Sequence, residues 1–122
     1  MALSSPVLRL RVRADFLAAA KAAWAARPAV VVQARHRDDG EDHVRTGFTA
    51  TRKIGNAVVR NRAKRRLREA ARRLLPLHGQ AGHDYVFIAR AGTPACPWQG
   101  LLDDVKAALI RLARAGTDSR TP

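Results

Sequence analysis

Cationic side chains gather in one stretch of this 122-residue sequence, and their chemistry is that of phosphate binding. Residues 44–74 hold eleven Lys or Arg residues and one acid, Glu69, so about a quarter of the chain carries +10 of the net charge of +13. The planar guanidinium of arginine can donate two parallel hydrogen bonds to phosphate and can stack on a base. A polyanion is therefore the expected partner, with nucleic acid ahead of an anionic membrane surface. The eleven cations are Arg45, Arg52, Lys53, Arg60, Arg62, Lys64, Arg65, Arg66, Arg68, Arg72 and Arg73.

Most of these cations are expected on one long helix, residues 57–75. Helical spacing places Val59, Ala63, Leu67, Ala70 and Leu74 on one stripe, as in a helix that faces a core. Arginines and lysines flank this stripe at i, i+4 spacing, where like charges repel. A merely solvated face is the alternative, but solvated helices normally interleave Glu with Lys. The pattern therefore favours a surface that binds a polyanion. Asn61, within the run, could read a base edge, fix a neighbouring group, or be an inert surface residue.

The remaining chemistry-bearing residues form no convincing catalytic or metal-binding set. The acidic stretch 38–42 could hold a metal, but a solvated turn is the better interpretation. Cys96 is the only cysteine, which excludes an internal disulfide and a Cys-based zinc site. We therefore expect no catalytic residue and no metal ligand in the chain. The four histidines are expected in loops or at strand ends: His36, His43, His78 and His83.

Composition indicates a folded, intracellular chain. Hydrophobic residues make up 47% of the sequence, enough for a core at this length. The longest apolar stretches are too short to span a bilayer. The acid-free N-terminus could suggest a transit peptide, but a helical pattern starting at Asp15-Phe16 favours part of the domain. We expect a single RNA-binding domain over 1–122, flexible at 1–8 and 116–122, in the reducing cytoplasm.

Three helices and three strands are expected to position the cationic surface. Strands 29–35 and 43–50 are expected to pair as a hairpin around the turn at Asp38-Asp39-Gly40. Proline and glycine mark the ends of the helices. This gives an α+β fold in the order α-β-β-α-β-α. The expected elements are helix 14–26, strand 29–35, strand 43–50, helix 57–75, strand 84–90 and helix 98–114.

Residues 52–73, RKIGNAVVRNRAKRRLREAARR, resemble the signature of the ribonuclease P protein family. The hallmark of that family is an Arg-Asn-Arg helix, which stands here as Arg60-Asn61-Arg62. Two further stretches, 13–16 and 84–90, look like the first helix of the family and the strand after its arginine helix. The resemblance covers about residues 9–113.

The resemblance implies a fold and a role that spacing alone does not show. The implied fold is a single-domain α/β sandwich, like domain 2 of ribosomal protein S5. Its order would be α-β-β-(β)-α-β-α, with a left-handed βαβ crossover through the arginine helix. The implied role is that of a protein subunit of ribonuclease P. In that enzyme a large RNA, using Mg²⁺, removes the 5′ leader of precursor tRNA, and the protein alone binds no cofactor. One protein per RNA is implied, with no DNA or membrane partner.

The resemblance also implies two sets of binding residues. A cleft between the first helix and the sheet would hold the single-stranded leader, through Phe16, Ala20, Val32 and Gln33. Contacts to the RNA would be made by Arg52, Lys53, Asn56, Arg60, Asn61, Arg62, Lys64, Arg65, Arg66 and Arg68.

The sequence departs from the family in this cleft. Ala20 and Gln33 stand where relatives often carry aromatic residues, and a short stretch between Lys21 and Pro28 suggests a reduced first strand. We therefore expect leader affinity to depend on salt more strongly than in aromatic-rich relatives. Phe16 is either a leader contact or ordinary core.

Two other classes share the size and charge. A basic ribosomal-type protein or RNA chaperone would bind RNA without any role in tRNA processing. A DNA-binding module would need more base-reading Asn and Gln on its recognition helix. The sequence leaves open which RNA elements are contacted, what each arginine contributes, whether the holoenzyme dimerises, and any role of Cys96.

Overall fold

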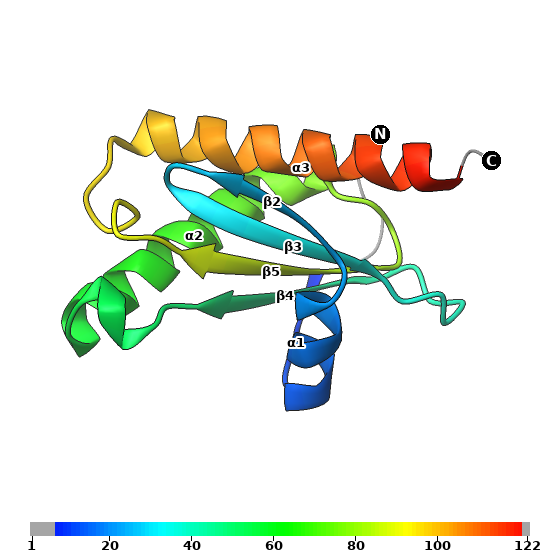
Figure 1. Cartoon of the computed structure of the whole chain (residues 1–122), viewed down its shortest axis with the longest axis horizontal. Helices are drawn as coiled ribbons and strands as arrows, with labels where there is room; N and C mark the ends of the chain where they lie inside the picture. Colours follow the sequence, from blue (N-terminus) through cyan, green and yellow to red (C-terminus); the bar gives the residue numbers. More distant parts are fainter. Residues whose placement is uncertain (1–6, 121–122) are drawn as a thin grey trace.

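The computed structural model describes residues 7–120, and the side chains of that range as far as residue 115. It is an α+β fold with one mixed sheet of five strands and three helices (Figure 1). This confirms the expected fold class. In chain order the elements are β1 (Val7–Arg9), α1 (Arg13–Ala20), β2 (Ala23–Arg27), β3 (Val30–His36), β4 (Val44–Thr49), the 3-10 turn η1 (Arg52–Ile54), α2 (Ala57–His78), β5 (His83–Ala89) and α3 (Trp98–Arg120).

The sheet does not contain the hairpin expected between strands 29–35 and 43–50. Its order is β1-β4-β5-β3-β2, so β5 lies between the two strands that were expected to pair. β5 runs parallel to β4 and antiparallel to β3. The first five of its seven residues are all buried, so both faces of the strand are covered. A strand covered on both faces belongs at the centre of a sheet. β3 instead forms its hairpin with β2 around the two-residue turn Pro28-Ala29.

The first helix is shorter than predicted. Residues 14–26 were expected to be helical throughout, but α1 ends at Ala20 and residues 23–27 form β2. Alanine favours a helix locally, yet tertiary packing overrides that preference when a strand can pair and bury its face. Here Ala25 pairs with Val32 and is only 2% exposed. The stretch before Pro28 therefore supplies a strand of five residues.

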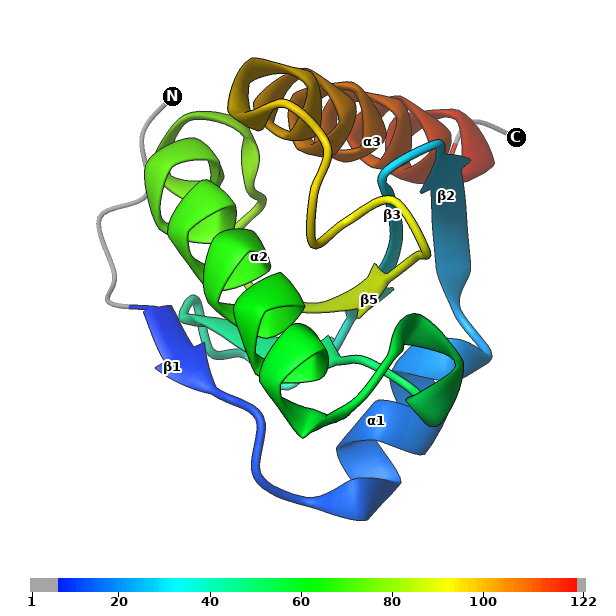
Figure 2. The same cartoon turned by 90° about the vertical axis from the view of Figure 1, so that its left-hand side faces the viewer.

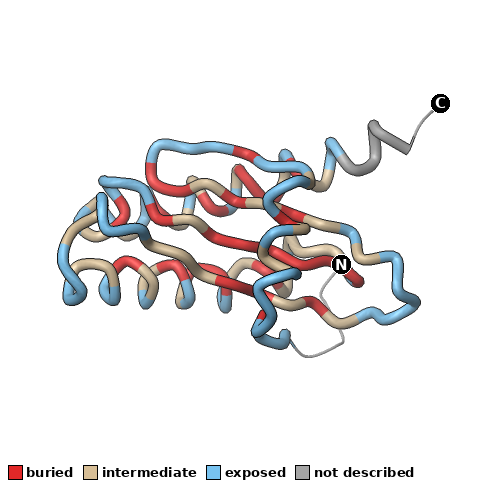
Figure 3. Tube along the Cα trace, turned by 60° about the horizontal axis from the view of Figure 1, so that its bottom comes forward, coloured by how far each residue is buried: buried red, intermediate tan, exposed pale blue. Residues whose placement is uncertain are grey.

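Helices cover the two faces of the sheet unequally. α2 and α3 pack on one face and against each other, where they bury most of the core, including Leu67, Phe87 and Leu109 (Figure 2). α1 packs on the other face over a smaller cluster in which Leu10, Ala19 and Val86 are buried. The tube view shows burial concentrated along the central strands (Figure 3). The α1 face therefore leaves strand surface uncovered.

Both long helices extend beyond their predicted ends. α2 was expected to end before Pro76 but continues to His78, and the Gly79 amide still donates to Leu75 O at 2.8 Å. α3 continues to Arg120, beyond the predicted end at 114. Of the ends expected to be flexible, 1–8 and 116–122, residues 7 and 8 lie in β1, which pairs with β4, and residues 116–120 lie in α3. Residues 1–6 and 121–122 lie outside the described range.

Candidate nucleic-acid interface

The start of α2 is built by a turn and a cap. η1 ends at Gly55, whose φ of 149° an L side chain rarely adopts. The Asn56 side chain then accepts a hydrogen bond from the Val59 amide at 3.0 Å, which caps the helix. Asn56 was predicted to contact RNA, and its side-chain oxygen is engaged in this cap. The turn brings Arg52 and Lys53 beside the first turn of α2.

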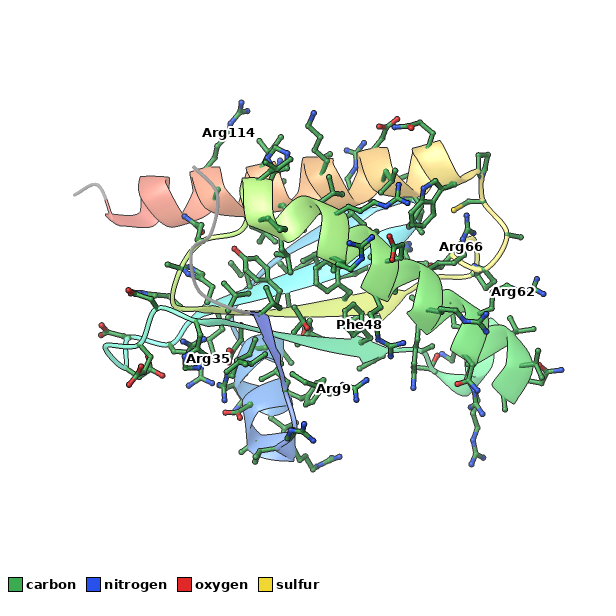
Figure 4. The ribbon with its side chains drawn as sticks, turned by 180° about the vertical axis from the view of Figure 1, so that it is seen from behind. Arg9, Arg35, Phe48, Arg62, Arg66 and Arg114 are labelled. Atoms are coloured by element: carbon green, nitrogen blue, oxygen red, sulfur yellow. The ribbon has the colours of Figure 1, made fainter. Side chains whose placement is uncertain are left out.

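Seven cations on η1 and on α2 as far as Arg68 have no acidic partner within 4.0 Å among the described side chains. Five of them are exposed and two, Arg60 and Lys64, are partly buried. Figure 4 shows Arg62 directed away from the protein. No described acid neutralises these seven, here called the open cations, so an outside anion can bind them. They are Arg52, Lys53, Arg60, Arg62, Lys64, Arg65 and Arg68.

Arg66 was predicted to contact RNA, but its guanidinium binds the protein itself. It donates to the backbone oxygens of Thr93 at 2.6 Å and Cys96 at 2.5 Å (Figure 4). It also lies 5.8 Å from the centre of the Trp98 ring. Arg66 thus ties α2 to the loop before α3, although Arg65 beside it is open.

The second half of α2 carries its own counter-ion. Glu69 accepts hydrogen bonds from Arg72 and Arg73, and these arginines lower the pKa of Glu69 to about 2. Arg73 also lies 5.4 Å over the Trp98 ring. The positive character of α2 is therefore concentrated in its first half and in Arg68.

A second arginine group lies on the α1 face of the sheet, around the fully buried Asp84. Arg45 donates to both Asp84 oxygens at 2.7 Å, and this contact raises the pKa of Arg45. Arg37, whose side chain is 3% exposed, donates to Asp84 Oδ1 at 3.0 Å. Arg35 lies 3.6 Å from Asp84 and 3.5 Å from Asp15 of α1. Sequence analysis counted Arg45 in the cationic stretch 44–74 but missed this network, because its members are far apart in the chain.

The four residues predicted for the leader cleft do not all share one face. Phe16 lies over Gly47 on the α1 face, partly buried, so close that a Cβ at position 47 would collide with its ring. Ala20 is exposed on α1, and Gln33 is half-buried on the same face of the sheet. Val32 is fully buried in the core under α2 and α3, because neighbouring strand residues alternate between faces. The placement of Val32 in the cleft is therefore wrong.

A groove that the sequence did not indicate runs between β1 and α2. It encloses about 440 Å³, and a hollow of about 140 Å³ shares several of its lining residues and reaches Phe16 and Gly47. Phe48 forms part of its floor, with the Arg68 guanidinium 5.4 Å from the ring centre. Arg9 of β1 lines both hollows (Figure 4). The groove connects the open cations to the α1 face.

Neither a metal centre nor a membrane span is found in the described part of the chain. No three His, Cys, Asp or Glu side chains among those described, residues 7–115, are grouped so that they could hold a metal ion. No helix in that range is long and apolar enough to cross a bilayer.

The cationic face and the α+β fold define an RNA-binding protein, and comparison with known proteins identifies its kind. The family model described as Ribonuclease P matches residues 5–113. The ribonuclease P protein component of Caulobacter vibrioides (strain NA1000 / CB15N) is 64% identical over 113 residues, which cover 89% of this chain and 76% of that protein. The corresponding protein of Ruegeria pomeroyi is 54% identical over 111 residues, with 89% of each covered.

Solved structures agree with the sequence relatives. The RNase P protein from Thermotoga maritima superposes with a TM-score of 0.72 at 30% identity, over 84% of this chain and 96% of that one. The Staphylococcus aureus RNase P protein superposes with a TM-score of 0.70 at 28% identity, over 86% of this chain and 94% of that one. The chain belongs to the ribonuclease P protein family. It is a subunit of the endoribonuclease RNase P, involved in tRNA 5′ maturation, as the Arg60-Asn61-Arg62 signature predicted.

Proposed function

We propose that the chain binds the catalytic RNA of ribonuclease P through the open cations. The observation that carries this proposal is that these seven side chains lie on η1 and one helix with no described acid to neutralise them. Phosphate oxygens would form charge-assisted hydrogen bonds with them and relieve their mutual repulsion. Asn61, exposed among them, is in position to contact the RNA as well.

The α1 face of the sheet is proposed to hold the 5′ leader of precursor tRNA. Phe16, Ala20 and Gln33 line this face, and the sheet next to α1 is open there. Val32 has no part in this proposal. A single strand laid on this face would run beside the groove that leads to the open cations.

Catalysis is proposed to belong to the RNA, with Mg²⁺ as its ion. The described side chains provide no donor set for a resident Mg²⁺, and both oxygens of the buried Asp84 are engaged by arginines. No step is therefore assigned to a metal held by this chain. One protein per RNA, a cytoplasmic location and a single RNA-binding domain complete the proposal.

The β4-α2-β5 crossover is proposed to be left-handed, as in domain 2 of ribosomal protein S5. β4 and β5 are parallel neighbours joined through α2. Seen from behind, α2 lies in front of the sheet, both strands point right, and β5 lies above β4 (Figure 4), which supports this hand. Such a crossover is a rare exception among βαβ units.

Reconstitution tests the proposed division of labour. The chain, the ribonuclease P RNA and precursor tRNA are combined with Mg²⁺, with each component also omitted in turn. Cleavage at the mature 5′ end should require the RNA, and the chain should lower the concentration of substrate and Mg²⁺ that is needed. Specific 5′ cleavage by the chain without RNA would overturn the assignment of catalysis to the RNA.

A further inference from the structure

We propose that Trp24 of β2 stacks on a base of the 5′ leader of precursor tRNA and supplies the aromatic surface that Ala20 and Gln33 lack. The inference rests on the proposed leader-binding face and adds to it a residue that determines how the leader is held. Trp24 falls within the helix that the sequence predicted over residues 14–26. The structure places it on a strand instead.

Strand alternation puts Trp24 on the α1 face. Its neighbour Ala25 points into the core on the opposite face and is 2% exposed. Trp24 itself is 63% exposed and is the only aromatic residue among the large exposed hydrophobics of the described chain. The other residue of β2 on this face, Ala26, is small and exposed as well. Packing in the core therefore does not explain why a tryptophan stands at position 24.

The strand register aligns Trp24 with the residues proposed to hold the leader. Trp24 pairs with Gln33, Gln33 with Val86, and Val86 with Gly47. Phe16 lies over Gly47 at the other end of this row. With strands about 4.8 Å apart, the row spans about 14 Å across the sheet. It therefore presents an aromatic ring at each end and an amide between them.

The chemistry of this row suits single-stranded RNA. An exposed aromatic ring stacks on any base, and the Gln33 amide can donate to or accept from a base edge. The residues of β2 and β3 on this face include no acid, and Arg35 lies two positions beyond Gln33. Because Arg35 is paired with Asp15 and Asp84, this row offers a base stacking and an amide contact, and the unpaired positive charge lies on the open cations.

Substitution in the reconstituted holoenzyme tests the role of Trp24. Trp24→Ala should weaken binding of precursor tRNA with a long leader by about tenfold, within the range measured for loss of one stacked base. Trp24→Phe should retain most of the affinity, and kcat at saturation should not change. Binding of a substrate with a one-nucleotide leader should be the same for all three proteins. Leu77→Ala, at a position 61% exposed on α2, is the matched control and should bind both substrates like the wild type.

A series of abasic leaders separates stacking from a general effect on structure. One leader position should exist at which removal of the base weakens wild-type binding but does not further weaken Trp24→Ala. If Trp24→Ala binds every leader as the wild type does, the inference about Trp24 is overturned. If the wild type itself binds long and short leaders equally, the leader-binding face fails as well. The two failures are thus distinguishable.

Fluorescence gives a readout that does not depend on the stability of the alanine variant. Trp98→Phe leaves Trp24 as the only tryptophan, since the sequence contains two. Stacking of a leader base should quench its emission in the holoenzyme with a long leader and leave it unchanged with a one-nucleotide leader. Unchanged emission with both substrates would contradict the proposal. So would a wild-type dimer that Trp24→Ala converts to a monomer in sedimentation, because the ring would then serve a protein interface.

Discussion

Arginines lie both on the strands beside α1 and on helix α2, and the two groups differ in what surrounds them. On β3, just after it and on β4, Arg35, Arg37 and Arg45 converge on the buried Asp84. On the first half of α2 and on η1, the open cations have no described acid within reach. The charge of the first group is neutralised inside the protein, and the charge of the second group is available to a partner. The number of arginines in a segment therefore says less about RNA binding than the presence of an internal counter-ion.

The strongest test of this comparison is the removal of the internal counter-ion. Asp84→Asn should lower the free energy of unfolding by about 3–5 kcal/mol, because it leaves buried guanidinium groups without their anion. Urea denaturation measures the change. Asp39→Asn, at an exposed carboxylate that also binds Arg37, is the control and should have a much smaller effect. A loss below about 1 kcal/mol for Asp84→Asn would mean that the strand arginines are not held by this carboxylate.

Removal of open cations should weaken RNA binding and leave the free energy of unfolding nearly unchanged. Arg60→Gln, Arg62→Gln and Arg65→Gln combined should weaken binding to the ribonuclease P RNA by about 10- to 100-fold, with little change in unfolding. The log–log salt slope should become shallower by about 2, since three phosphate contacts are lost. Filter binding at several salt concentrations measures both values. Arg111→Gln, at an exposed cation of α3, is the control. An unchanged slope in the triple variant would refute the proposed interface.

Arg65 and Arg66 provide the sharpest form of the comparison, because they are neighbours with different partners. Arg66→Gln should lower the free energy of unfolding by about 1–2 kcal/mol, since two backbone carbonyls lose their charged donor. Its affinity for RNA should stay within about twofold of the wild type. Arg65→Gln should leave stability intact and weaken RNA binding. Equal loss of RNA binding in both variants would place Arg66 in the interface after all.

The smallest effect is expected from the only acid of α2. Glu69→Gln should free Arg72 and Arg73 to bind phosphate, so that RNA affinity rises by about twofold and its salt slope steepens by less than 1. The pKa of Glu69 is lowered to about 2 by these arginines, so its carboxylate stays ionised above about pH 3. The difference between Glu69→Gln and the wild type should therefore persist from pH 5 to pH 8. A difference that vanishes at pH 5 would show that Glu69 is already protonated there.

Local patterns in the sequence were enough to predict α2, β5 and α3. Apolar residues recur at helical spacing in α2 and α3 and form a continuous run in β5. The signature at Arg60-Asn61-Arg62 identified the family. The sheet order was not predicted, because the pairing of β5 with β3 and β4 depends on residues about 40 to 60 positions apart. The helix expected over 14–26 failed because alanine propensity is weaker than the pairing of β2 with β3.

For the same reason, the sequence indicated which cations share a helix but not the partner of each one. Helical spacing placed the open cations on one surface, but it could not distinguish Arg65 from Arg66. That distinction depends on a loop about 30 residues further along the chain. The exposure of Trp24 likewise depends on a strand that the local sequence does not predict. Spacing reveals which side chains share an element, and the partner of each is set by the rest of the fold.

The central position of β5 has a consequence for how this protein is made. β5 is the last strand of the chain, yet it lies between β3 and β4. Until residues 83–89 leave the ribosome, β3 and β4 each have an unpaired edge, and Asp84 is not yet present to receive their arginines. Unpaired edges and distant pairings make folding slow and expose the chain to aggregation. The residues of α2 therefore leave the ribosome before the sheet on which α2 packs is complete. The sheet is completed only when β5 inserts between β3 and β4.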